Sequence, residues 1–343
     1  MPTNLLVIAR GVQIGASLLV AGVFTFEIVV ARVGRRPAAQ ANPAEGRLHR
    51  LALWSLAATL FSALLWFAFE VVNMSGLPLA RAFSGGSWET VLFATRFGHV
   101  WQLRLGLIAA CLALLALRRR RRVEHAALRF ALWFLSFALL VSLAWISHAA
   151  ATGLQPFGLL NDALHLYAAA AWLGGLPCLA IYLTTTSPAG ATPILRRFST
   201  LSLCCVSALV LSGIGNAWLL VGSLPALFTT PYGALLLLKL ALFAILLGFG
   251  ARNRLLVKAN YRSTDAPPDV LARLRHNVRW ELGLGLGIVA VVGWLGVTPP
   301  PHPAHFKKHV NLGGNTRCVT PLRLTTPLSG PEVNGTMSVQ VSQ

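Results

Sequence analysis

Residues 234–250 read ALLLLKLALFAILLGFG, and this run decides the class of fold. Lys239 is its only charged residue, and apolar and polar residues do not alternate along it. An α-helix rises about 1.5 Å per residue, so a block from 232 to 251 can cross the roughly 30 Å hydrocarbon core of a bilayer. A strand of a membrane barrel would need alternation. The run therefore predicts a transmembrane helix.

Seven more apolar blocks of similar length lie along the chain. They are residues 5–30, 51–74, 100–117, 128–150, 159–183, 199–221 and 280–297. Charged residues make up only 11% of the sequence, whereas a soluble domain carries about 25%. We therefore expect an all-α, polytopic membrane helix bundle with eight transmembrane helices in residues 1–298. Residues 299–343 are polar and open on consecutive prolines, which predicts a disordered extracytoplasmic tail.

The basic residues predict the orientation of the bundle. The connectors after the first, third, fifth and seventh blocks hold 20 of the 29 Lys and Arg residues, including the run Arg118 to Arg122. The connectors on the other side hold only Arg81 and Arg96. By the positive-inside rule, the basic connectors face the cytoplasm and both termini lie outside. The same distribution explains the net charge of +19 without nucleic acid as a partner.

Four residues of metal-binding type fall at a similar predicted depth near the outer surface: Met74, His99, His148 and His165. Thioether sulfur prefers Cu(I), and imidazole accepts either oxidation state of copper, so this set predicts a copper site. Each residue alone also fits an ordinary role, as a polar anchor at the interface or as packing.

Other residues stand out because charge and glycine are unusual inside apolar blocks. Glu70 falls in the outer third of its block, where it can pair with Arg10, and Arg104 lies one turn inside the third block. Lys239 has no acidic residue nearby in sequence, which makes a functional role more attractive for it than for the others. The run Trp172-Leu173-Gly174-Gly175 has two glycines that allow another backbone to approach closely.

Together these motifs resemble the bacterial copper resistance protein D (CopD) family of inner-membrane proteins. The matching stretches are Met74-Ser75-Gly76, Thr95-Arg96-Phe97-Gly98 with Trp101 and Arg104, Ser147-His148-Ala149-Ala150, His165 to Gly175, Arg197-Phe198-Ser199, Thr230-Pro231-Tyr232-Gly233 with Lys239, Asn253-Arg254 and Thr298-Pro299-Pro300. The resemblance covers residues 1 to about 301 and is most specific from His165 to Asn253.

The resemblance implies copper handling at the inner membrane, with uptake into the cytoplasm from a periplasmic CopC-type copper-binding protein. No nucleotide-binding motif is present, and we expect a transporter, not an enzyme. Two alternatives stay open. One is a membrane haem protein in which His148 and His165 bind one haem iron, and the other is an assembly factor that delivers metal without transporting it.

Overall fold

The computed structural model describes residues 2–31, 43–121, 126–147, 155–259 and 267–301. Residues 1–306 form one compact unit, and a second unit, residues 307–343, lies wholly outside the described residues. Two sequence predictions also fall outside them, namely the role of His148 and the disorder of the tail from residue 302 onward. All that follows concerns the first unit.

The eight predicted transmembrane helices are confirmed, since eight described helical segments are long and apolar enough to cross a membrane. The elements in chain order are α1 (Pro2–Thr25), η1 (Phe26–Ala31), α2 (Pro43–Ser75), α3 (Leu79–Ser84), α4 (Ser87–Ala94), α5 (Arg96–Arg121), α6 (Ala126–Val141), η3 (Ala144–Ile146), α7 (Gln155–Trp172), α8 (Leu176–Thr185), α9 (Pro188–Leu220), α10 (Leu224–Thr229), α11 (Pro231–Ala259) and α12 (Pro268–Leu295). No strand occurs among the described residues.

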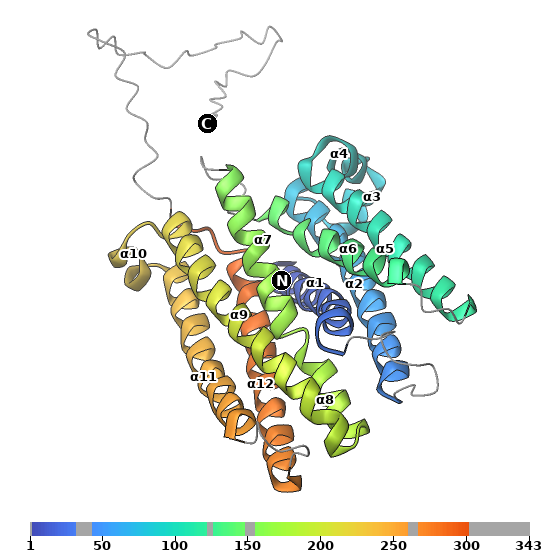
Figure 1. The fold of residues 1–343 in the computed structure, drawn as a ribbon. Helices are drawn as coiled ribbons and strands as arrows, with labels where there is room; N and C mark the ends of the chain where they lie inside the picture. The colour runs from blue at the N-terminus through green and yellow to red at the C-terminus, as the bar shows by residue number, and fades with distance from the viewer. Residues whose placement is uncertain (1, 32–42, 122–125, 148–154, 260–266, 302–343) are drawn as a thin grey trace, which may run out of the picture. The chain divides into compact units, whose positions relative to one another are not determined.

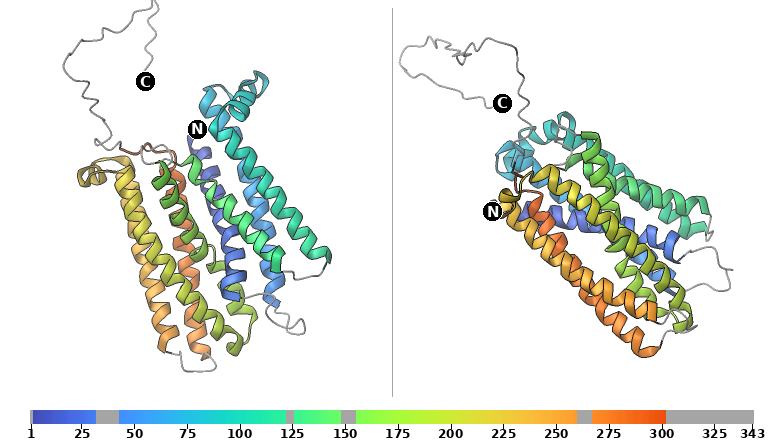
Figure 2. Two further views of the ribbon diagram at one scale, coloured as in Figure 1. Left: turned by 45° about the horizontal axis from the view of Figure 1, so that its top comes forward. Right: turned by 60° about the vertical axis from the view of Figure 1, so that its left-hand side comes forward.

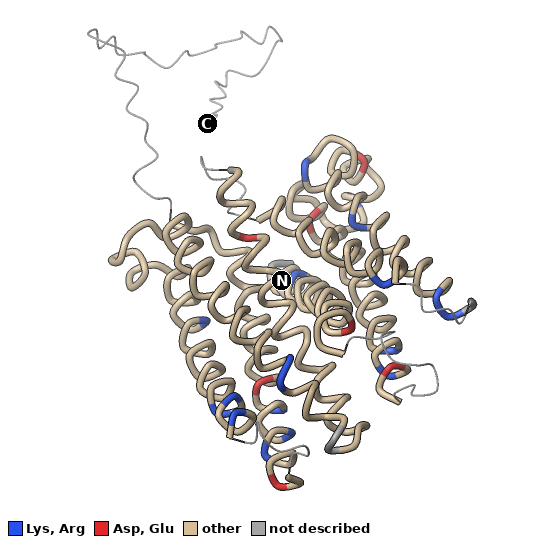
Figure 3. Tube along the Cα trace, in the orientation of Figure 1, with Lys and Arg blue, Asp and Glu red and all other residues tan. Residues whose placement is uncertain are grey.

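The bundle has two chemically different ends (Figures 1 and 2). The short helices α3, α4 and α10 lie at one, which we call the short-helix end. Lys and Arg gather toward the other, at the end of α5, the end of α11 and the start of α12 (Figure 3), and we call it the basic end. The short helices in the connectors were not predicted from the sequence.

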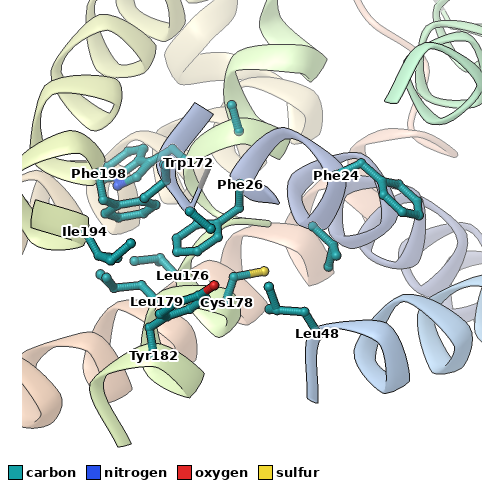
Figure 4. Close-up of a cluster of buried hydrophobic side chains, with 14 of the residues drawn as sticks. Phe24, Phe26, Leu48, Trp172, Leu176, Cys178, Leu179, Tyr182, Ile194 and Phe198 are labelled. Carbon is teal, nitrogen blue, oxygen red and sulfur yellow. The ribbon is translucent and has the colours of Figure 1, made fainter. Parts of the chain in front are cut away.

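The fifth span is a broken helix, because α7 ends at Trp172 and α8 begins at Leu176. At the break, a Cβ added to Gly174 would lie on the backbone of Leu18 in α1, so the two backbones touch as the paired glycines predicted. Nearby, α1 gives way to the π-helical turn η1. The side chains of Phe26, Trp172 and Phe198 pack together there in the buried core (Figure 4).

The third and seventh spans begin in the same way, which reveals an internal repeat. Each follows a short helix and a threonine, Thr95 or Thr230, whose hydroxyl donates to the carbonyl four residues earlier at 2.6 Å. Each hydroxyl also accepts from the backbone N–H three residues later, at 3.0 Å, and so caps the new helix. The spans before them are both followed within two residues by a glycine with positive φ, Gly76 after Ser75 and Gly222 after Leu220.

Candidate functional site

A pocket of about 430 Å³ lies among α7, α9, α11, α12 and α1, and we call it the histidine pocket. Its polar lining consists of Arg10, Ser147, Asp162, His165, Asn216, Tyr232 and Lys239. His165 comes ten residues after the start of α7, and Lys239 eight residues after the start of α11. At about 1.5 Å per residue both are roughly 12–15 Å from the short-helix end, deep enough to meet inside the bundle.

Both ring nitrogens of His165 have partners. Nδ1 lies 2.9 Å from Ser212 Oγ, and Nε2 lies 3.5 Å from Lys239 Nζ. Because an ammonium can only donate, Nε2 is the acceptor and Nδ1 carries the hydrogen. Ser212 accepts that hydrogen and donates its own to the carbonyl of Ala208 at 2.6 Å. The nitrogen of His165 that remains available to a metal therefore faces a lysine.

Amide and carboxylate groups complete this network. Asn161 donates to the Ser212 carbonyl at 2.9 Å and to Asn216 Oδ1 at 2.8 Å. Asn216 in turn donates to Asp162 Oδ1 at 3.4 Å. Asp162 also interacts electrostatically with Lys239. The lysine that had no acidic neighbour in sequence thus has one across the helix interface.

The internal repeat gives this lysine a counterpart. Lys239 lies nine residues after Thr230, and Arg104 lies nine residues after Thr95. Arg104 is only 1% exposed, and its guanidinium donates to the Leu139 carbonyl at 2.7 Å, to Ser142 Oγ at 2.6 Å and to Ser17 Oγ at 3.0 Å. The first half of the chain therefore holds a buried cation that is fixed by hydroxyl and carbonyl groups. The second half holds a partly buried cation, Lys239, beside an imidazole and a pocket.

Two other predicted copper ligands, Met74 and His99, do not line the histidine pocket. Met74 is 50% exposed and lines an adjoining pocket of about 230 Å³, which shares Arg10, Trp66, Ile146 and Ser147 with the histidine pocket. His99 is exposed on the first turn of α5 and lines neither that pocket nor the histidine pocket. Within the described ranges, no three or more His, Cys, Asp or Glu residues are grouped so that they could hold a metal ion.

Glu70 and Arg10 meet through an aromatic ring instead of the direct ion pair that we expected. Trp66 Nε1 donates to Glu70 Oε2 at 3.1 Å. The guanidinium of Arg10 lies over the Trp66 ring, 5.1 Å from its centre, in a cation–π contact. The indole ring of Trp66 therefore contacts both side chains, while Arg10 Nε has no hydrogen-bond partner among the described residues.

Sequence reasoning missed Asn161, Asp162, Ser212 and Asn216. A usable signal existed, because Asn161 and Asp162 lie four and three residues before His165 and so share a helix face with it. Ser212 and Asn216 have the same spacing of four on the facing helix α9. Polar residues that recur at helical spacing inside two adjacent apolar blocks predict a buried polar contact between those helices.

Eight apolar spans with a pocket of ionisable side chains between them define a multi-pass membrane protein with a polar site among its helices. The family model described as copper resistance protein D-like, N-terminal domain, matches residues 1–156, and the model of copper resistance protein D matches residues 192–295. The inner membrane protein YebZ of Escherichia coli (strain K12) is 32% identical over 223 residues, which cover 62% of this chain and 71% of YebZ. The chain belongs to the copper resistance protein D family.

Two other relatives have names that refer to copper. Copper resistance protein D of Pseudomonas syringae pv. tomato is 29% identical over 70% of this chain and 82% of its own length. Copper transport protein CutJ of Bacillus subtilis (strain 168) is also 29% identical, over 75% of this chain. The chain spans about half of that protein, 47% of its length. No solved structure matches the chain.

Proposed function

We propose that this protein carries copper across the bacterial inner membrane into the cytoplasm, and that His165 binds the ion in transit. Family membership and the copper-related names of two relatives support copper as the substrate. The observation that carries the site is a partly buried imidazole in a pocket of about 430 Å³, with one nitrogen held by Ser212. Imidazole fits either oxidation state of copper.

We propose that the ammonium of Lys239 occupies the cation position next to His165 until copper displaces it. An ion that binds His165 Nε2 must take the place of the ammonium 3.5 Å away. Asp162 lies in the same pocket and compensates the positive charge of either the lysine or the copper ion. Its carboxylate therefore always has a cation nearby. When the ion moves on, the lysine returns and helps to release it.

For the orientation we rely on the positive-inside rule, which assigns the basic end to the cytoplasm, and inward transport is the proposal that the family resemblance suggests. The short-helix end then faces the periplasm, where we propose that a CopC-type copper-binding protein delivers the ion. Met74, His99 and His148 are proposed as ligands that capture copper at this face before it reaches His165.

The test of this function is a comparison of two histidine variants in copper uptake. Purified protein in proteoliposomes takes up copper, and His165→Ala lowers the initial rate at least tenfold. His276→Ala is the matched control, because His276 is exposed on α12 and contacts only Trp280 among the described side chains. Equal uptake by His165→Ala and the parent would remove His165 from the pathway.

The two alternatives make different predictions in the same preparations. A haem protein would show a Soret band in its absorption spectrum. Among the described residues no contact favours haem, because Lys239 lies at the His165 nitrogen that would have to face the iron. An assembly factor would bind its delivering partner without copper flux.

A further inference from the structure

Glu281 lies in the middle of helix α12. It comes 13 residues after the start of α12 and 14 before its end, or roughly 20 Å from either. Its side chain is 3% exposed. Asn253 donates to Glu281 Oε1 at 3.2 Å, and Asn277 donates to Asn253 Oδ1 at 2.7 Å.

No basic side chain forms an ion pair with Glu281 among the described residues. The comparison with Glu27, which is also 3% exposed, is informative, because Arg118 Nη1 lies 2.8 Å from Glu27 Oε2. A buried carboxylate that no cation compensates is costly. Glu281 therefore needs a cation that the chain itself does not supply.

Glu281 also lines a pocket of about 260 Å³, which we call the glutamate pocket. Its other polar lining residues are Ser199, Ser202, Asn253 and Arg254, and Trp172 also lines it. The two pockets share no lining residue, yet both lie along α7, α9, α11 and α12. Between them Trp172 packs edge-on against Phe243, with ring centres 6.2 Å apart. The break between α7 and α8 follows directly after Trp172.

The chemistry of the donors identifies the missing cation. A carboxylate with amide neighbours offers oxygen and no sulfur or imidazole, so it is a poor match for Cu(I), which prefers soft ligands. Buried carboxylates inside membrane transporters are typical proton relays. We propose that Glu281, oriented by Asn253 and Asn277, binds and releases a proton during the copper transport cycle. This inference rests on the proposed function for its coupling to copper, but not for the proton site itself.

Few other groups can bind or repel a proton near Glu281. Arg254 of α11 is the one charged side chain among the remaining lining residues of the glutamate pocket, and its guanidinium donates to Ser199 of α9. The apolar pocket on the other side of Glu281, formed by α1, α8 and α12, contributes no other titratable group. Removing this single carboxyl should therefore remove the proton site.

Infrared difference spectroscopy tests the site without any transport. The protein in lipid is measured across steps of pH, and the parent shows the carbonyl stretch of a protonated carboxyl that is missing in Glu281→Gln. Glutamine is isosteric and keeps an oxygen to accept from Asn253. Asp269→Asn, which removes an exposed carboxyl from the same helix, keeps the band. Identical spectra from Glu281→Gln and the parent would overturn the proposal.

Proteoliposomes with an internal pH-sensitive dye test the coupling. Copper added outside causes proton movement by the parent and by Asp269→Asn, and Glu281→Gln reduces it at least tenfold while equilibrium copper binding changes by less than about twofold. Copper uptake by the parent without proton movement, or undiminished proton movement by Glu281→Gln, would contradict the coupling. A parent that takes up no copper would instead contradict the proposed function, and the infrared result would still decide the proton site.

Discussion

At the scale of single residues, the informative comparison is between Lys239 and Arg104, which occupy matching positions in the two halves. Arg104 makes three hydrogen bonds and has no imidazole partner. Lys239 makes one long contact, to His165, at 3.5 Å. A lysine is a compact charge on a flexible stem, whereas a guanidinium is held by several directed bonds. Moving the side chain away from its contacts therefore costs less free energy for Lys239 than for Arg104.

We expect Lys239→Met to tighten equilibrium binding of Cu(I) by about tenfold, because the ion no longer competes with an ammonium at His165. Loss of a hydrogen bond to a charged group is worth roughly 1.5–3 kcal/mol, and 1.4 kcal/mol is tenfold in affinity. Competition with a chromophoric chelator measures the change. Lys258→Met, an exposed lysine at the end of the same helix, should leave affinity unchanged. Weaker binding by Lys239→Met would show that the lysine is a structural support instead.

The residues of the histidine pocket were only partly predictable. His165 and Lys239 stood out because charge and imidazole are rare inside apolar blocks, whereas Asp162 did not, since it lies near the start of its block and 77 residues before the lysine that it compensates. Their contact depends on the depth at which two helices meet, which the sequence gives only to within a turn or two.

At the scale of elements, the notable feature is the break in the fifth span. Hydropathy predicted one helix over 159–183, because it measures apolar character and not whether each carbonyl keeps its helical partner. The structure instead ends α7 at Trp172 and restarts at Leu176. The glycines were recognised as a place of close approach, and Gly174 does lie against the backbone of Leu18.

Gly174→Ala should destabilise the protein, because its Cβ would meet the backbones of α1 and α7 and no flexible side chain can yield. Overpacking of this kind costs about 1–3 kcal/mol. Thermal unfolding in detergent measures it as a lower midpoint temperature. Gly248→Ala is the control, since nothing lies within 4 Å of an added Cβ there. A midpoint equal to that of the control would mean that α1 and α8 can separate freely.

At the scale of the whole molecule, apolar block lengths were enough to predict eight spans, and the structure confirms them. The repeat was not predicted, although Thr95-Arg96-Phe97-Gly98 and Thr230-Pro231-Tyr232-Gly233 share a threonine, an aromatic residue and a glycine. The structure adds what these matching residues do not show: in each copy a glycine with positive φ and a short helix precede the capping threonine.

The orientation is the prediction that belongs to this scale. In a cysteine-free background, we expect Ser84→Cys at the short-helix end to react with a membrane-impermeant maleimide added to intact spheroplasts. Lys258→Cys at the basic end should react only after the membrane is opened. Both positions are exposed, so access to solvent depends on topology alone. The reverse labelling pattern would place copper capture at the cytoplasmic face and exclude a periplasmic donor.

The edge-to-face pair of Trp172 and Phe243 has one more consequence, for the electrical behaviour of the membrane. Trp172 lines the glutamate pocket and Phe243 lines the histidine pocket, and the two pockets share no lining residue. Under the proposed function, copper would then cross in discrete turnovers that require the indole to move, and the resting protein would not leak charge.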